Sequence, residues 1–356
     1  MVITIIIALV VFSVIVLAHE LGHFITGKAV RAKIEEFGIG FPPRLFGVRK
    51  GETIYSLNAI PFGAFNKFAG EEDPKIPRSL ASKSRGTRLL VLSAGSLMNI
   101  LLPLFLFSIA FMVPHDMVTE PVVIKKVAPG SPAAMANIEP GDTLVSLNEK
   151  PVPNIATLQR YINLNLGEEI NLLIQHSDST TEEVQVIPRW KPPQGQGAIG
   201  IEMDVEAALS NRTIVKHREP FWKAIPMGAS ACVETLVLYK NGIIGVITGA
   251  IPATLTGPVG IVHMMGEVAK FGISPLLEFA ALISLILGIL NLFPLPALDG
   301  GRIVFVLLEW VRRGKRVSPR IEGLVHSIGF AMLIGLMLII TYQDIIRIVS
   351  GESLIP

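Results

Sequence analysis

The chain has 356 residues, of which half are hydrophobic and only 17% are charged, and its mean hydropathy is +0.55. Soluble proteins of this length are rarely so apolar, so the composition argues against an ordinary soluble enzyme and indicates an integral membrane protein with soluble modules. The net charge of +2 gives no reason to expect a nucleic-acid partner, and the single cysteine, Cys232, excludes an intramolecular disulfide.

Four stretches are long and apolar enough to cross a lipid bilayer, which takes about 20 residues of helix. The first stretch does not read as a signal peptide, because no basic residue precedes it and no small-residue cleavage motif follows it. We therefore predict four transmembrane helices, at residues 2–27, 89–113, 276–293 and 324–346.

Lysines and arginines predict the orientation of these spans. They are concentrated in the loop after the first span, from Lys28 to Arg88, and in the loop between the third and fourth spans, from Arg302 to Arg320. The positive-inside rule places both loops in the cytoplasm. The N-terminus, residues 114–275 and the C-terminus then lie outside, and we expect a multi-pass protein of a bacterial inner membrane with this segment in the periplasm.

The first span ends in the motif HELGH, which puts His19, Glu20 and His23 where apolar side chains are expected. Ionisable groups in a membrane helix are costly and are functional by default. Histidines four residues apart share one helix face, about 6 Å apart along the axis, so both imidazoles can bind one zinc ion. Glu20 starts about 100° round the helix from His19, in a position to take the proton of a water. The alternative is a hydrogen-bonded histidine pair inside a helix bundle.

From about 117 to 203 the composition turns soluble, with short β-type runs between turn residues. Within this segment, residues 128–152 resemble the PDZ-domain signature, with Gly141 and Asp142 at its turn. The length suffices for one PDZ domain and not for two, and the alternative is a generic small β-rich domain. Because PDZ domains bind peptide C-termini by adding a strand, such a peptide is a candidate partner.

Apolar side chains near helical spacing, with charged ones among them, follow between about 221 and 251. This segment could form a fifth span or a helix that lies on the membrane surface.

The segment NLFPLPALDGGR, residues 291–302, ends the third span with an acidic residue, Asp299. Pro294 and Pro296 forbid a continuous helix there, so backbone groups become free to bind a partner. A catalytic zinc needs a third protein ligand, and Asp299 is the candidate. The alternative is a broken helix end with a surface aspartate.

HELGH in the first span and NLFPLPALDGG in a later one together resemble the paired motifs of the site-2 protease family of intramembrane zinc metalloproteases. GPVGI at 257–261 and SAGSLMNILL at 93–102 fit the same family. The resemblance covers nearly the whole chain, although well-known bacterial members carry tandem PDZ domains. It implies that Glu20 is the general base and that one zinc ion is bound by His19, His23 and Asp299.

The resemblance also implies which residues handle the substrate, namely Asn291 and the backbone around Pro294 and Pro296. In this family the loop after the first span holds a membrane-associated β-hairpin, which we expect at about 35–70 and which residues 43–70 could supply. An edge strand there could pair with an unwound substrate helix by strand addition, through Phe62, Gly63 and Ala64.

If Asp299 binds the zinc held by HELGH, the first and third spans must run in the same direction. The second span achieves this alone, so we predict that the segment at 221–251 is peripheral. The expected fold is a polytopic α-helical membrane protein with four transmembrane helices, a membrane-associated β-hairpin and one inserted extracytoplasmic PDZ domain of β-rich α+β type. The division expected is a membrane domain at 1–115, the PDZ domain at 116–203, an extracytoplasmic connector with an amphipathic helix at 204–275, and a second membrane part at 276–356.

The function implied is proteolysis of transmembrane segments in single-span membrane proteins, such as anti-sigma factors already trimmed outside the membrane, or of remnant signal peptides. The PDZ domain would act as a size filter for such substrates. A membrane-anchored PDZ adaptor or chaperone with a non-catalytic metal site is one alternative, and it would work without Glu20. A metal transporter is another, but it should carry more ionisable groups along a pore. We predict the protease.

Overall fold

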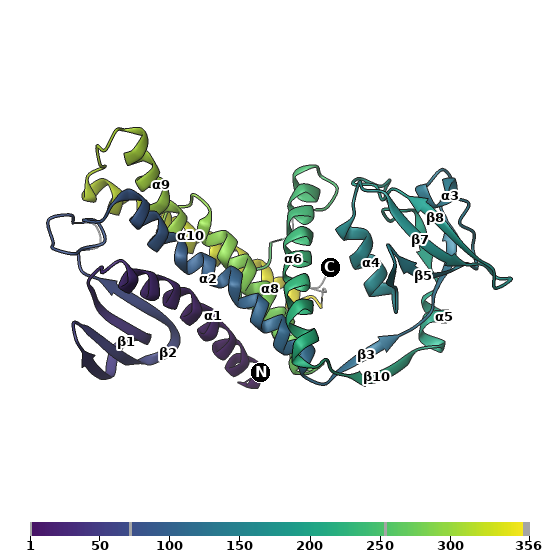
Figure 1. Cartoon of the computed structure of the whole chain (residues 1–356), viewed down its shortest axis with the longest axis horizontal. Coiled ribbons are helices and arrows are strands. Elements are labelled where there is room, and N and C mark those ends of the chain that lie inside the picture. The colour runs from purple at the N-terminus through teal and green to yellow at the C-terminus, as the bar shows by residue number, and fades with distance from the viewer. Residues whose placement is uncertain (1, 71–72, 253–254, 352–356) are drawn as a thin grey trace. The chain divides into compact units, whose positions relative to one another are not determined.

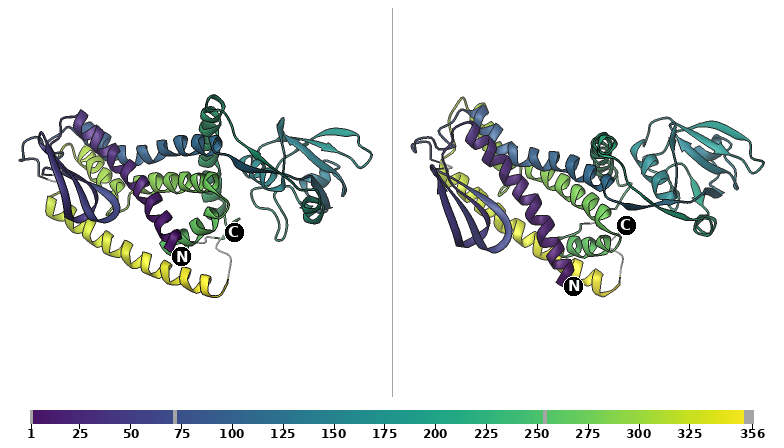
Figure 2. Two further views of the ribbon diagram at one scale, coloured as in Figure 1. Left: turned by 90° about the horizontal axis from the view of Figure 1, so that it is seen from below. Right: turned by 60° about the horizontal axis from the view of Figure 1, so that its bottom comes forward.

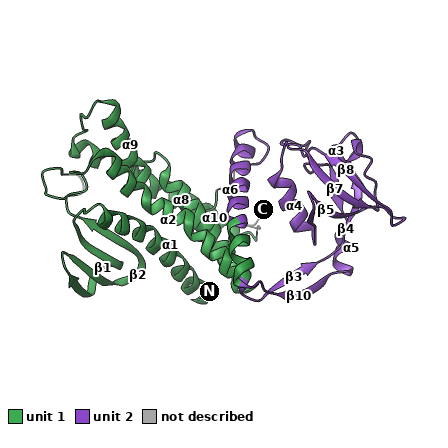
Figure 3. Ribbon diagram, viewed as in Figure 1, with its two compact units in different colours: residues 1–111, 221–229, 255–356 green, residues 112–220, 230–254 purple. Residues whose placement is uncertain are grey.

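The computed structural model describes residues 2–70, 73–252 and 255–351. The chain forms two compact units, which Figure 3 colours separately. Unit 1 comprises residues 1–111, 221–229 and 255–356, and unit 2 comprises residues 112–220 and 230–254.

Unit 1 contains the four long apolar helices that the sequence predicts. They are α1 (Val2–Ala29), α2 (Arg85–Met112), α8 (Ile273–Leu292) and α10 (Pro319–Val349). Many of the large apolar side chains of α1 and α10 are exposed, as expected for helices that face lipid. Among the described residues a fifth helix, α6 (Phe221–Ile247), is also long and apolar enough to cross a membrane. Length and composition therefore offer one candidate more than the four spans predicted.

Small residues let these helices approach closely. A Cβ on Gly22 of α1 would overlap the carbonyl oxygen of Ala94 in α2, and one on Gly288 of α8 would lie 2.9 Å from the carbonyl oxygen of Ser96 in α2. A Cβ on Gly266 of α7 (Pro258–Ala269), just before α8 begins, would lie 2.5 Å from the Thr4 side chain at the start of α1. The two helices α1 and α8 therefore begin near one another, and α2 runs back between them (Figure 1).

A β-hairpin follows α1, formed by β1 (Ile34–Lys50) and β2 (Thr53–Phe68). The strands are antiparallel partners, and their pairing shifts between the pairs Ile39–Ala64 and Phe41–Ile60, which leaves Phe62 and Gly63 in an irregular stretch. The two strands extend from residue 34 to residue 68, compared with the β loop predicted at about 35–70, and the hairpin lies beside α1 (Figure 2).

Two helices of unit 1 were not predicted: α7 and α9 (Asp299–Val311). The α7 helix packs against α1, α8 and α10, so residues 255–275 fold with the long helices rather than with unit 2. Its first turn is capped from α10, because the fully buried carboxylate of Asp344 accepts hydrogen bonds from the backbone N–H of Gly257 at 3.0 Å and of Gly260 at 2.8 Å. Asp344 thus fixes the C-terminal part of α10 to α7.

Unit 2 contains a β-rich domain in the segment 116–203, where the sequence predicts a PDZ domain. Its sheet has the strand order β8-β7-β5-β4-β9, with β6 paired to β5. The strands are β4 (Val122–Val127), β5 (Thr143–Leu147), β6 (Lys150–Pro151), β7 (Ile170–Gln175), β8 (Thr181–Val186) and β9 (Ile201–Met203). Two helices, α3 (Pro132–Met135) and α4 (Ile155–Leu164), complete the domain, and Leu144, Leu158 and Leu172 are among the residues of its core.

A two-stranded ribbon carries the chain into and out of this domain. The strand β3 (His115–Thr119) pairs antiparallel with β10 (Thr213–His217), and the short helix α5 (Val205–Ser210) precedes β10.

Candidate active site

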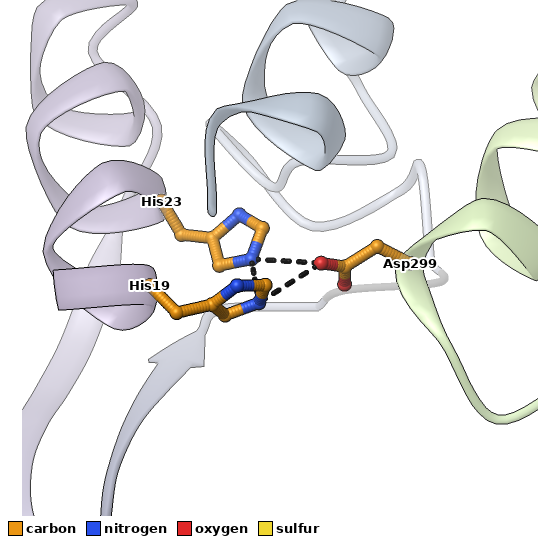
Figure 4. Close-up of side chains that lie close together, drawn as sticks. All are labelled: His19, His23 and Asp299. Carbon is orange, nitrogen blue, oxygen red and sulfur yellow. Dashed lines mark hydrogen bonds and ion pairs between the residues drawn. The ribbon is translucent and has the colours of Figure 1, made fainter. Parts of the chain in front are cut away.

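Three side chains from distant parts of unit 1 meet at the C-terminal half of α1. His19 and His23 lie one turn apart on α1, and Asp299 is the first residue of α9 (Figure 4). The Nε2 atoms of the two histidines are 3.1 Å apart, and Oδ2 of Asp299 lies 3.0 Å from Nε2 of His19 and 3.2 Å from Nε2 of His23. The sequence predicts that His19 and His23 share one face of a helix, and the fold brings the carboxylate of Asp299 next to them.

This triangle of donor atoms fits a zinc ion. Ligands bound at about 2.0–2.1 Å on a tetrahedral ion lie about 3.3 Å from one another, close to the three distances found here. Two imidazoles and one carboxylate are a donor set that zinc enzymes use, and three protein ligands leave the fourth position open. Within the described residues, these three are the group able to hold a metal ion.

The imidazole of His23 is oriented from α2. Its Nδ1 lies 2.8 Å from the backbone carbonyl oxygen of Val91. Because a carbonyl oxygen can only accept, Nδ1 must carry the hydrogen and donate it, and Nε2 keeps its lone pair for a metal. The backbone of α2 thus selects the histidine tautomer that a zinc site needs.

The same helix leaves room for the ligands at Gly95. A Cβ at this position would overlap Nε2 of His23 and would lie 2.7 Å from Nε2 of His19. Glycine is therefore required where the two histidine tips face α2. This residue belongs to the SAGSLMNILL segment, whose small residues thus contribute space at the site as well as close helix packing.

The approach to Asp299 is a tight turn. The α8 helix ends at Leu292 and α9 begins at Asp299, so the chain is not helical across Pro294 and Pro296, as the prolines predict. A Cβ on Gly300 would overlap the carbonyl oxygen of Phe293, which makes glycine necessary after the aspartate. The backbone N–H of Ala297 donates to Nδ1 of His326 in α10 at 2.9 Å, which ties the turn to that helix.

Glu20 lines a cavity of about 170 Å³ together with His23 and Asp299. The side-chain amide of Asn66 in β2 donates to Oε2 of Glu20 at 2.8 Å and to the backbone carbonyl oxygen of Glu20 at 2.6 Å. The carboxylate therefore reaches the same space as the metal ligands, as a general base must.

The other predicted site residues lie in α8, in the turn before Asp299 and in β2. Asn291 is half-buried near the end of α8, and Pro294 and Pro296 lie in the turn that leads to Asp299. In β2, the backbone N–H of Gly63 lies 3.4 Å from Oγ of Ser13 in α1, and the ring of Phe62 is 6.5 Å from that of Phe12. The contacts of Val91, Gly95 and Asn66 with the centre were not predicted.

Comparison with known proteins agrees with this geometry. Residues 7–336 match the sequence pattern of Peptidase family M50.

This chain belongs to peptidase family M50.

Membership confirms the resemblance to site-2 proteases that the paired motifs suggest. The M50 chain is 35% identical over 344 residues to a protein of Clostridium acetobutylicum that is provisionally named a zinc metalloprotease, covering 96% of this chain and 97% of that protein. It is also 30% identical over 423 residues to the zinc metalloprotease RasP of Geobacillus kaustophilus, covering 95% and 96% of the two chains.

Among solved structures, the PDZ domain of an SdrC-like protein from Listeria monocytogenes is similar to 24% of this M50 chain and to 90% of its own length. The sequence identity is 19% and the TM-score is 0.22.

Proposed function

We propose that this chain is an intramembrane zinc metalloendopeptidase that cleaves transmembrane segments of single-span membrane proteins. The observation that carries the proposal is the convergence of two imidazoles and a glutamate, on a helix apolar enough to lie in a membrane, with the carboxylate of Asp299. Membership of a peptidase family and similarity to proteins named zinc metalloproteases support it.

Each polar group of the centre has a distinct task. His19, His23 and Asp299 would hold the zinc, which when bound supplies a Lewis acid for the scissile carbonyl and lowers the pKa of water. Glu20 accepts the proton of the attacking water and passes it to the nitrogen of the departing amine. The hydrogen bond from His23 to Val91 keeps that imidazole in the tautomer that can bind metal.

The substrate must be locally extended, because the peptide bonds of a helix are shielded by their own hydrogen bonds. The irregular stretch of β2 at Phe62 and Gly63, which Ala64 follows, supports pairing with such a segment by strand addition. Asn291 and the backbone at Pro294 and Pro296 are proposed to hold the substrate on the other side, since helix α8 ends there and leaves backbone groups unpaired within the helix.

The directions of the helices support the predicted topology of four spans. The α7 helix contacts the start of α1 and directly precedes α8, so α1 and α8 begin near one another. The C-terminal ends of both helices lie near His19, His23 and Asp299, so the two helices run in the same direction. One crossing by α6 between α2 and α8 would reverse α8. We therefore propose that α6 does not cross, that the basic loops face the cytoplasm of a bacterial cell, and that the PDZ-like domain lies outside the inner membrane.

The PDZ-like domain is proposed to act as a size filter that excludes substrates with a large domain outside the membrane. Binding of a peptide C-terminus along its sheet is the other role open to such a domain. Pre-trimmed anti-sigma factors and remnant signal peptides are the substrates proposed, because both are single spans with little structure left outside.

The test is cleavage of a tagged single-span protein in membranes by wild type and by Glu20→Gln, with products resolved on a gel. We expect cleavage by wild type and a loss of at least about 1,000-fold in the variant, which removes the base but none of the metal ligands. Zinc content and thermal unfolding of the purified variant serve as controls, because both should match wild type. Equal product from both proteins would favour the adaptor, in which the metal site is not catalytic.

A further inference from the structure

Asn66, in the strand β2 of the β-hairpin, hydrogen-bonds to Glu20, the proposed general base. Its Nδ2 atom donates one hydrogen bond to Oε2 of Glu20 and another to the backbone carbonyl oxygen of the same residue, at 2.8 and 2.6 Å. Because both partners on Glu20 are acceptors, only the amide NH₂ can face them, so the orientation of the Asn66 side chain is fixed. Two bonds from one NH₂ group restrict both the backbone and the carboxylate of Glu20.

We propose that Asn66 is a positioning residue, which holds the carboxylate of Glu20 in the cavity shared with His23 and Asp299. This inference rests on the proposed function and adds to it a residue outside the metal-binding motifs. A catalytic group must stay within about 0.5 Å of its working position, and a residue whose own rotamer is fixed by hydrogen bonds from a rigid element meets that need. Here that element is the strand β2, in which Asn66 is paired with Phe37 of β1.

The bonding pattern of Asn66 argues against a purely structural role in the sheet. Both hydrogen bonds that its side-chain amide donates go to Glu20, and none goes to the described residues of the hairpin. Asn58, on the same strand, is the contrasting case. Its Nδ2 donates to the backbone carbonyl oxygens of Ile39 and Gly40 and to Oγ of Ser56, all inside the hairpin. Asn58 therefore hydrogen-bonds within the hairpin, whereas Asn66 hydrogen-bonds to Glu20.

The experiment compares Asn66→Leu with Asn58→Leu, since leucine has the same number and branching of side-chain heavy atoms as asparagine but no hydrogen-bond donor. Steady-state cleavage of a single-span model substrate in detergent gives kcat and KM for wild type and both variants. We expect Asn66→Leu to lower kcat by about 10- to 100-fold with KM within about twofold of wild type, the range found when a partner of a catalytic group is removed. Asn58→Leu should keep most of kcat and instead lower the thermal stability of the protein.

Two readouts do not depend on turnover. The zinc content of Asn66→Leu should equal that of wild type, because Asn66 contacts none of the three metal ligands in the described structure. The dissociation constant of the model substrate, measured on the inactive Glu20→Gln protein with and without Asn66→Leu, should change by less than about twofold, because a residue that acts only through the base adds nothing to binding.

The outcomes distinguish a failure of this inference from a failure of the proposed function on which it rests. No cleavage by wild type would overturn the proposed function, and the role of Asn66 with it. Cleavage by wild type together with an unchanged kcat for Asn66→Leu would overturn only the positioning role. Weaker substrate binding with an unchanged kcat would make Asn66 a substrate contact, and an equal loss of kcat in Asn58→Leu would reduce the effect to damage to the sheet.

Discussion

The candidate metal centre requires the absence of a side chain at Gly95 as well as the side chains of its three proposed ligands. Gly95 faces the tips of His19 and His23, and the same helix supplies the Val91 carbonyl that orients His23. One turn of α2 therefore sets both the space around the ligands and the chemical form of one of them. The two histidines can be recognised from HELGH, and Gly95 lies in the SAGSLMNILL segment, but neither pattern predicts that this turn of α2 contacts the histidines.

We expect Gly95→Ala to weaken zinc binding by at least about tenfold, because its Cβ would overlap Nε2 of His23 and would push the imidazoles apart. Zinc affinity is measured by competition with a chelator on the purified protein. Gly86→Ala on the same helix is the control, since a Cβ there has no neighbour within 4 Å. Equal zinc affinity in Gly95→Ala and Gly86→Ala would show that α2 can shift to accept the methyl group.

At the scale of elements, the sequence predicts the long helices well because an apolar run of some 20 residues has one dominant interpretation. It predicts the end of α8 equally well, because prolines act locally. The short helices α7 and α9 were missed, since at 12 and 13 residues they are too short for the apolar-run criterion that identifies the spans. The contact of Asn66 with Glu20 was missed for another reason: it joins residues 46 positions apart, and strand alternation says nothing about partners at that separation.

The cap on α7 leads to a prediction about α10. Removing the carboxylate in Asp344→Ala leaves the N–H groups of Gly257 and Gly260 unpaired in a buried site, so we expect a loss of stability of about 1–3 kcal/mol. Asp344→Asn should lose less, because it retains one acceptor oxygen. The measurement is the midpoint of thermal unfolding in detergent, with Tyr342→Phe at an exposed position of α10 as control. A midpoint for Asp344→Ala equal to that of the control would contradict the cap.

At the scale of the whole molecule, the path of the chain through the membrane can be tested with single cysteines in a Cys232→Ser background. We expect Gln194→Cys, His217→Cys and Thr248→Cys to react with a membrane-impermeant maleimide from outside the inner membrane, and Lys75→Cys to react only after permeabilisation. His217 and Thr248 flank α6, so they report directly on that helix. Labelling of only one of the two from outside would mean that α6 crosses the membrane.

One strand, β2, carries both Asn66 and the stretch from Phe62 to Ala64 proposed to hold the substrate. If the substrate is held there, its binding stretch and the residue that contacts Glu20 are a fixed number of residues apart on one strand. The cleavage position would then be set by its distance from the bound stretch and not by the side chains on either side of the bond. Substrates unrelated in sequence would each give one product of defined length.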